Sequence, residues 1–260
     1  MRARHPVFQM PIERGAPVWR YFDFPKFVSL LKERSLYFCR ADLLGDPPEG
    51  SFTRAREVER ERVLASLPTG KAKEEKAVAF GRHANLNAAV LKGTYVNCWH
   101  QGDHESMALW RGYGGGPCGV AIRSTVDLLD RLIPEQFDPA PSPTWEANAI
   151  LIGAVRYVDY ASELERVPND DNAYAPFVCK SVAYEHESEI RALFMDFVRD
   201  DVTELPAGRS IPVDLESLIL QVIVSPLSPD WFGPLVNDTC QRFGARVTVG
   251  HSTVGEAPVY

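Results

Sequence analysis

Strand-like and helix-like segments follow one another in an irregular order along this chain, and that order limits the folds it can adopt. Strand patterns at 18–23 and 35–41 enclose a helical stripe at 24–34, whereas later strand patterns fall both in adjacent pairs and between helices. A doubly wound parallel sheet needs regular alternation. The mixed order therefore predicts an α+β fold with a mixed, largely antiparallel sheet and flanking helices.

The first helix carries its own start and packing signals. Asp23 can cap it, and Phe27, Leu30 and Leu31 recur at the spacing that lines one helical face. Asp103 is the candidate cap of the short helix that ends before the Gly-Gly-Gly stretch.

Further strands and loops are expected in the second half of the chain. Residues 149–160 form a strand pattern long enough to be central, and the unbroken apolar run at 218–226 indicates a buried strand. Residues 184–194 are expected to form another strand. The Pro and Gly content of 45–50 predicts a turn, and 200–210 is expected to be a loop.

A single domain is expected from residue 17 to residue 260. Residues 1–16 are expected to form a flexible leader. Residues 54–92 are rich in Ala, Glu, Lys and Arg, which predicts one or two solvated helices inserted into the domain.

The composition indicates a globular protein. Hydrophobic residues make up 45% and charged residues 24%, and the net charge of −7 gives no sign of general nucleic-acid affinity, although a local basic groove stays open. The five cysteines lie far apart without a Cys-x-x-Cys pair, which predicts reduced thiols in a cytoplasmic protein. We find no secretory signature at the N-terminus and no apolar run long enough to span a membrane.

Charges gather in the stretch YEHESEIRALF. On a strand, Glu185, Glu187, Glu189 and Arg191 would share one face. Carboxylates at that spacing repel one another and are costly to bury unpaired. Their position before an apolar strand, with Lys180 nearby, favours a pocket, and a structural ladder of ion pairs is the alternative.

The sequence contains none of the common motifs for dinucleotides, phosphates, serine hydrolases or zinc proteases. His186 would face away from Glu187 and Glu189 on a strand, so this segment alone is not expected to form a three-ligand metal site.

Three other features have both a structural and a functional interpretation. Arg20, which precedes Tyr21, is either an ion-pair partner on an edge strand or a clamp for phosphate or carboxylate. Trp110 and Tyr113 are more simply core aromatics than a ligand platform. The Asp-Pro-Pro-Glu string at 46–49 is most simply a turn.

Taken in order, these segments resemble the bacterial domain-of-unknown-function 2971 family. The pattern comprises an Arg-Tyr strand, a Leu-Tyr-Phe strand, an Asp-Pro-x-Glu-Gly turn, a Cys-Trp strand, a Ser-Met-x-x-Trp-x-x-Tyr helix and Lys-x-x-x-Tyr-x-x-Glu-x-Glu-x-Arg. It extends from about residue 18 to about residue 255. The resemblance implies a domain type but little chemistry.

The chain also resembles ADP-ribosyltransferases. In that family a strand with Arg or His, a helix and a second strand precede a late strand with Glu-x-Glu, and WRYFD, the helix, SLYFC and HESEIRALF fall in that order. The resemblance implies that Arg20 holds the phosphate or ribose of NAD, that Glu189 stabilises the positive charge formed as nicotinamide leaves, and that Glu187 orients the nucleophile. The Ser-Thr-Ser strand of that family is missing here.

The first functional hypothesis is therefore an NAD-consuming ADP-ribosyltransferase-like enzyme, such as a toxin or an anti-phage effector. NAD would be the co-substrate, a protein or a nucleic acid the acceptor, and a neutralising protein a further partner, with no metal and no membrane involved. The other residues expected to bind the nucleotide are Tyr21, Trp110, Tyr113, Lys180 and Arg191.

Two other classes stay open. A non-catalytic sensor or defence domain would hold an anionic ligand or nucleotide with Arg20, Lys180 and Arg191, and the glutamates would be their ion-pair partners. A metal-dependent nuclease would combine Glu49 with the two glutamates of the Glu-x-Glu motif.

Overall fold

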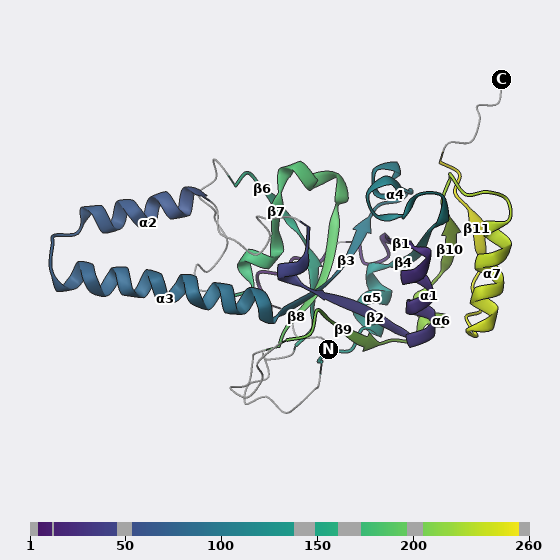
Figure 1. The fold of residues 1–260 in the computed structure, drawn as a ribbon, viewed down its shortest axis with the longest axis horizontal. Helices are drawn as coiled ribbons and strands as arrows, with labels where there is room; N and C mark the ends of the chain where they lie inside the picture. The colour runs from purple at the N-terminus through teal and green to yellow at the C-terminus, as the bar shows by residue number, and fades with distance from the viewer. Residues whose placement is uncertain are drawn as a thin grey trace, which may run out of the picture.

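A nine-stranded sheet forms the centre of the molecule in the computed structural model, which describes residues 5–11, 13–45, 54–137, 149–160, 173–196 and 205–254 (Figure 1). The strands of this sheet are β1 (Pro17–Asp23), β2 (Ser35–Arg40), β3 (Thr94–Gln101), β4 (Gly119–Thr125), β5 (Leu151–Ala154), β8 (Glu189–Met195), β9 (Gly208–Pro212), β10 (Gln221–Val224) and β11 (Val249–His251). All of its pairings are antiparallel except β10 with β11, so the predicted α+β class and largely antiparallel sheet are confirmed.

Helices and a small second sheet surround this centre. The helices are α1 (Phe24–Glu33), α2 (Arg54–Ser66), α3 (Lys71–Gly93), α4 (Met107–Tyr113), α5 (Val126–Leu132), α6 (Leu215–Leu218) and α7 (Phe232–Arg242). Short 3-10 helices are η1 (Ala41–Leu43), η2 (Gly116–Cys118), η3 (Ala175–Val178) and η4 (Val182–Glu187). The second sheet pairs β6 (Arg156–Val158) with β7 (Cys179–Ser181) in parallel.

The central strand β3 has two different edges. One edge pairs with β8 over seven residue pairs, from Thr94 to His100. The other edge is shared: β1 pairs with its C-terminal end, at His100 and Gln101, and β2 pairs with its N-terminal end, at Tyr95 and Val96. Residues 97–99 pair with neither β1 nor β2, so these two strands are separated along this edge of β3. We call the gap between β1 and β2 the split.

The main core lies on one face of this sheet. Phe27 of α1, Leu129 of α5 and Val236 of α7 pack there against Val18 and Phe22 of β1. The expected signals of α1 are confirmed, because Asp23 accepts a hydrogen bond from the backbone of Lys26 and the predicted apolar stripe is buried. Local sequence signals therefore determine this corner of the fold.

Several expected elements differ from the observed ones. The strand expected at 149–160 divides into β5 and β6, which belong to different sheets. β5 pairs with β8, and the backbone N–H of Val155 continues that register by donating to the carbonyl of Glu189, whereas Arg156 begins the pairing of β6 with β7. The helix α4 is capped by Ser106 rather than by Asp103. The loop expected at 200–210 contains the start of β9, and the turn at 46–49 lies outside the described residues.

The N-terminal segment packs against the body where the structure describes it, and its expected flexibility stays a prediction. Val7 and Phe8 are buried in a second apolar cluster on the opposite face of the sheet. Gln9 forms an antiparallel bridge with Ala154 at the outer edge of β5. The segment is held because it covers apolar side chains and satisfies an exposed strand edge.

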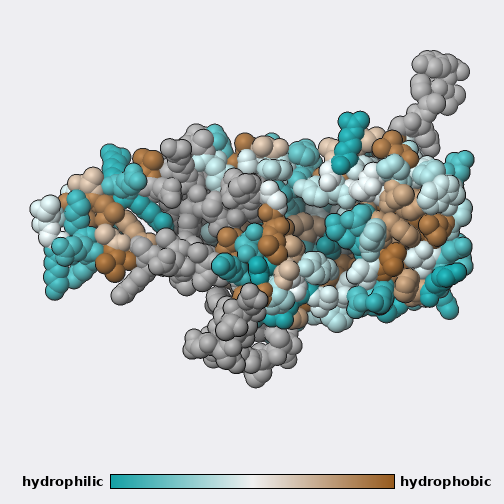
Figure 2. Space-filling model, viewed as in Figure 1, coloured by the Kyte–Doolittle hydropathy of each residue, from teal (hydrophilic) through white to brown (hydrophobic). Residues whose placement is uncertain are grey.

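The inserted helices α2 and α3 project from the body as a long hairpin, which we call the arm (Figure 1). Val58 and Val78 are more than half exposed there. Figure 2 shows hydrophilic and hydrophobic residues interspersed on its visible surface. The expected solvated helices at 54–92 thus correspond to this arm.

Two neighbouring glycines after α4 provide a test of this packing. Gly115 and Gly116 have φ values of 67° and 72°, and an added Cβ would lie 2.7 Å from the Cβ of Asp23 at Gly115 but would have no neighbour within 4 Å at Gly116. We expect Gly116→Ala to lower the free energy of unfolding by about 1 kcal/mol through the left-handed backbone alone. We expect Gly115→Ala to cost about 1–3 kcal/mol more through overpacking. Urea denaturation of the pair measures the difference, and equal losses would contradict the close contact.

Candidate active site

A ladder of buried charges lies where β7, η4 and β8 meet. Lys180 is 6% exposed, Glu187 7%, Glu189 3% and Arg191 1%. The ammonium of Lys180 donates to Oε2 of Glu187 and, at 3.1 Å, to Oε2 of Glu189. Arg191 donates through Nε and Nη2 to both oxygens of Glu189 at 2.7 and 3.0 Å, and through Nη1 to the carbonyl of Phe177. Two cations thus hold two carboxylates side by side.

The local backbone places these residues differently from the expected strand. The hydroxyl of Ser181 caps η4 by accepting from the backbone of Ala183, and Ser188 ends η4 in the left-handed region with φ 40°. Glu187 therefore lies on η4, and only Glu189 and Arg191 lie on β8. The prediction of one strand across 184–194 is wrong at its first half, because Ser188 interrupts the strand alternation.

The ladder keeps Glu189 ionised. Burial alone would raise the pKa of this carboxyl, but the charge and hydrogen bonds of Arg191, the charge of Lys180 and a hydrogen bond from the Cys98 side chain lower it to about 2. The backbone N–H of Glu189 also donates to the hydroxyl of Tyr157 at 2.8 Å. The site therefore contains a fixed negative charge at neutral pH.

Tyr113 closes the end of the ladder nearest to solvent. It is 51% exposed at the end of α4, and its hydroxyl donates to Oε1 of Glu187 at 2.7 Å. Burial and the Glu187 carboxylate raise the pKa of Tyr113, so it stays a protonated donor. His100 lies beside it in the network, with Nδ1 2.6 Å from the carbonyl of Glu187, and burial lowers the pKa of His100.

Arg20 occupies the split between β1 and β2. Its Nη2 donates to the main-chain carbonyl of Tyr37 at 3.2 Å, and its guanidinium lies 5.9 Å from the ring centre of Trp99. Its Nη1 is buried and lacks a hydrogen-bond partner among the described residues. Burial lowers the pKa of Arg20 to about 10, and the Cys98 and Cys39 side chains oppose that shift. Such a cation can accept an anionic partner.

The strand alternation directs Arg20 and Glu189 to opposite faces of the sheet. On β1, Arg20 lies between Val18 and Phe22 and shares their face of the sheet, which is the face of the main core. On β8, Ile190 lies on that same face, so Glu189 lies on the opposite one. The guanidinium lies at the level of the sheet, because it contacts a main-chain carbonyl. The Cys98 side chain raises the pKa of Arg20 and lowers the pKa of Glu189.

Tyr21 and Trp110 belong to the packing and not to this ladder. Their rings meet edge to face at 4.9 Å in a third buried cluster, and the hydroxyl of Tyr21 accepts from the backbone of Ser106. The indole of Trp110 donates to Glu105. The structure thus gathers Lys180, Glu187, Glu189, Arg191 and Tyr113, and leaves Tyr21 and Trp110 in structural contacts.

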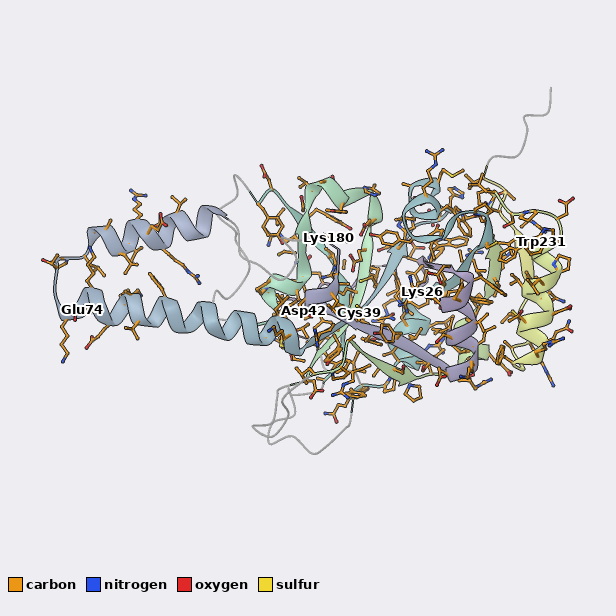
Figure 3. All side chains as sticks on the ribbon, viewed as in Figure 1. Lys26, Cys39, Asp42, Glu74, Lys180 and Trp231 are labelled. Atoms are coloured by element: carbon orange, nitrogen blue, oxygen red, sulfur yellow. The ribbon has the colours of Figure 1, made fainter. Side chains whose placement is uncertain are left out.

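Sequence reasoning missed His100, Tyr157 and Cys98. Each reaches the ladder through strand register: His100 pairs with Glu189, Cys98 pairs with Arg191, and Tyr157 pairs with Lys180. Cys98 and His100 are two residues apart on β3 and therefore share one face of that strand. This spacing is the signal in the local sequence that could have grouped them. Figure 3 shows Lys180 and Cys39 between the arm, whose outer part carries Glu74, and the opposite end, which carries Trp231.

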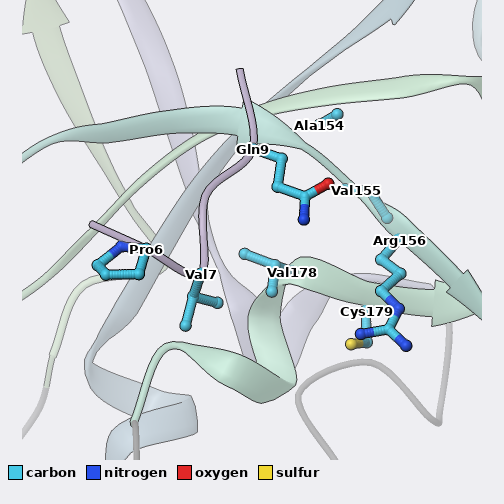
Figure 4. Close-up of a pocket in the computed structure, with 8 residues that line it drawn as sticks. All are labelled: Pro6, Val7, Gln9, Ala154, Val155, Arg156, Val178 and Cys179. Carbon is cyan, nitrogen blue, oxygen red and sulfur yellow. The ribbon is translucent and has the colours of Figure 1, made fainter. Parts of the chain in front are cut away.

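A pocket of about 200 Å³ lies next to the ladder but is separate from it. Its walls come from the N-terminal segment, the β5–β6 junction and the η3–β7 junction (Figure 4). Neither Glu187 nor Glu189 lines it. The pocket expected from the charges of YEHESEIRALF therefore stays a prediction.

No cluster of three or more metal-ligating side chains occurs in the part of the chain that the structure describes. Glu49, the third carboxylate of the nuclease hypothesis, lies outside that part. Among the same described residues, no helix combines the length and the apolar character needed to cross a bilayer.

No protein-family model matches this chain, and no curated protein matches it either. The resemblance to the domain-of-unknown-function 2971 family therefore stays a prediction. Among solved structures, the chain is similar to DarT of Thermus sp. 2.9 in complex with ADP-ribosylated ssDNA, with 11% identity over 97% of both chains and a TM-score of 0.35. It is also similar to the same DarT in complex with NAD+, with 12% identity over 94% of this chain and 97% of that chain and a TM-score of 0.37. These scores are too low to carry an argument.

Proposed function

We propose that this protein is an NAD-consuming enzyme of the ADP-ribosyltransferase type. The observation that carries the proposal is the pair of carboxylates, Glu187 and Glu189, bridged by the ammonium of Lys180 at the head of β8. Burial of a lone carboxylate is costly, but here Lys180 bridges both carboxylates and Arg191 also holds Glu189. The chain therefore supplies a preorganised negative charge of the kind that stabilises a cationic transition state.

The reaction would use each carboxylate differently. Departure of nicotinamide leaves positive charge on the ribose, and Glu189, with its pKa of about 2, stays ionised to stabilise that charge. Glu187, at the exposed end of the ladder, accepts the proton of the incoming nucleophile. Lys180 and Arg191 act as positioning residues, because their contacts are with the carboxylates.

Arg20 is the anion-binding residue of the proposal, although strand alternation directs it to the opposite face of the sheet from Glu189. Its buried Nη1 lacks a partner among the described residues, and a phosphate oxygen of NAD would satisfy it. β1 and β8 both pair with β3, so Arg20 and Glu189 come from strands that flank the same central strand.

The wider setting follows from this activity. The proposed acceptor is a protein or a nucleic acid, with water taking its place in the purified protein, and the proposed biological role is that of a toxin or an anti-phage effector in the cytoplasm. Such an activity depletes NAD, so a neutralising protein partner would protect the host. A metal has no role in this chemistry.

The direct test is nicotinamide release from NAD by the purified protein, measured by chromatography with and without EDTA. We expect release that EDTA does not reduce. Release that EDTA abolishes would contradict the metal-independent chemistry of the proposal, and no release at any NAD concentration would contradict the proposal itself.

A second candidate, a non-catalytic sensor of an anionic nucleotide, is favoured by one observation. Both oxygens of Glu189 already accept hydrogen bonds from cations, as a structural ion pair would require. In that case Arg20 alone would engage the ligand. Thermal stabilisation by NAD or another nucleotide without turnover, lost in Arg20→Gln, would support this candidate.

A further inference from the structure

One carboxylate oxygen of the ladder has a different kind of partner from the others. Oε2 of Glu187 and both oxygens of Glu189 accept from Lys180 or Arg191, whereas Oε1 of Glu187 accepts from the uncharged hydroxyl of Tyr113. Tyr113 is half exposed, while both glutamates are buried. Oε1 of Glu187 is therefore the oxygen whose partner, the half-exposed Tyr113, another hydrogen-bond donor could displace.

We propose that the Tyr113 hydroxyl is a placeholder for the acceptor. It occupies, on Oε1 of Glu187, the position that the acceptor's own hydroxyl takes during transfer. This inference depends on the proposed function and adds the acceptor position and its chemical class. Tyr113 is the last residue of α4, so its ring can turn into solvent and release Glu187 without opening a buried cavity.

The charges of the ladder define the acceptor class. Lys180 and Arg191 balance Glu187 and Glu189, and the proposed function already places the ribosyl cation beside Glu189, so a second cation such as a guanidinium acceptor would add a further uncompensated charge. A carboxylate acceptor has no proton to donate to Glu187 at neutral pH. An uncharged hydroxyl, like that of Tyr113, fits both requirements.

The transfer step balances without a further reactant. The acceptor oxygen forms a bond to C1′ of the ribose, the bond from C1′ to the nicotinamide nitrogen breaks, and nicotinamide leaves with the bonding electron pair. The acceptor proton moves to Oε1 of Glu187 and then to water. With water as the acceptor, the products are ADP-ribose, nicotinamide and one proton.

The experiment compares Tyr113→Phe with the parent protein and with Trp231→Phe. Trp231 is an exposed aromatic residue at the far end of the molecule, and its replacement also removes one polar hydrogen (Figure 3). We expect Tyr113→Phe to raise kcat for NAD hydrolysis about tenfold, because a hydrogen bond to a charged carboxylate is removed and water takes its position. KM for NAD should stay the same, and Trp231→Phe should behave like the parent.

A second arm uses phenol, agmatine and acetate as small hydroxyl, guanidinium and carboxylate acceptors. We expect Tyr113→Phe to form the ADP-ribosyl adduct of phenol, detected by mass spectrometry, and not the other two adducts. An active parent with unchanged or slower release in Tyr113→Phe, or preferential transfer to agmatine or acetate, overturns the placeholder and leaves the proposed function standing. Absence of nicotinamide release from every protein overturns both.

Discussion

Nicotinamide release by Glu189→Gln is expected to fall about 100- to 1000-fold, because the amide removes the fixed charge that stabilises the ribosyl cation. The substitution should also destabilise the fold. Arg191 and Lys180 direct three N–H donors at the oxygens of Glu189, and an amide replaces one of those acceptors with a donor. We expect the free energy of unfolding to drop by about 3–5 kcal/mol, as when a buried ion pair loses one partner. Kinetics and urea denaturation measure the two effects separately.

Glu187→Gln is the matched comparison. Its amide oxygen can face Lys180 and its amide N–H can face the Tyr113 oxygen, so the loss of stability should be smaller, about 1–2 kcal/mol. Rates must be expressed per folded molecule, with the folded fraction taken from circular dichroism at the assay temperature. A Glu189→Gln protein that is folded and releases nicotinamide at the parent rate would remove Glu189 from the mechanism.

The fold could be predicted where the signal is local. Asp23 and the apolar stripe of α1 are neighbours in sequence, and the helix they predict is the one observed. β9 was missed because its residues, GRSIP, have only Ile211 buried and give no apolar alternation. The change of sheet after Val155 was missed because it is set by two partner strands that are distant in sequence, β8 for β5 and β7 for β6.

The candidate site divides in the same way. Lys180, Glu187, Glu189 and Arg191 could be selected from the sequence because they lie within twelve residues of one another. Their geometry could not be, since Ser188 takes a left-handed conformation that its residue type does not announce. The contact of Tyr113 with Glu187 depends on how α4 packs against η4, and the position of Arg20 in the split depends on strand register. One sequence reveals neither.

Lys180→Met should be the most destabilising change at the ladder that removes no carboxylate. Lys180 is the cation between the two glutamates, with its side chain 7% exposed, and without it two carboxylates share a buried site. We expect a loss of about 3–5 kcal/mol at pH 7. The matched control is Lys26→Met: its side chain is 74% exposed in an ion pair with Asp23 at 2.9 Å, and such surface pairs contribute about 0–1 kcal/mol.

The pH dependence of that loss identifies its cause. The pKa of Glu189 in the folded parent is about 2, below its ordinary value of 4.5, so its contribution to stability is present above about pH 4.5 and is lost as the pH falls toward 2. Lys180→Met raises the folded-state pKa and removes part of that contribution. The stability difference between parent and variant should therefore be greatest at neutral pH and shrink between pH 4.5 and 2, as the carboxylates become protonated in both proteins. Urea denaturation at pH 7 and near pH 3 measures it, and a difference that stays constant would assign the role of Lys180 to packing of its aliphatic chain rather than to its charge.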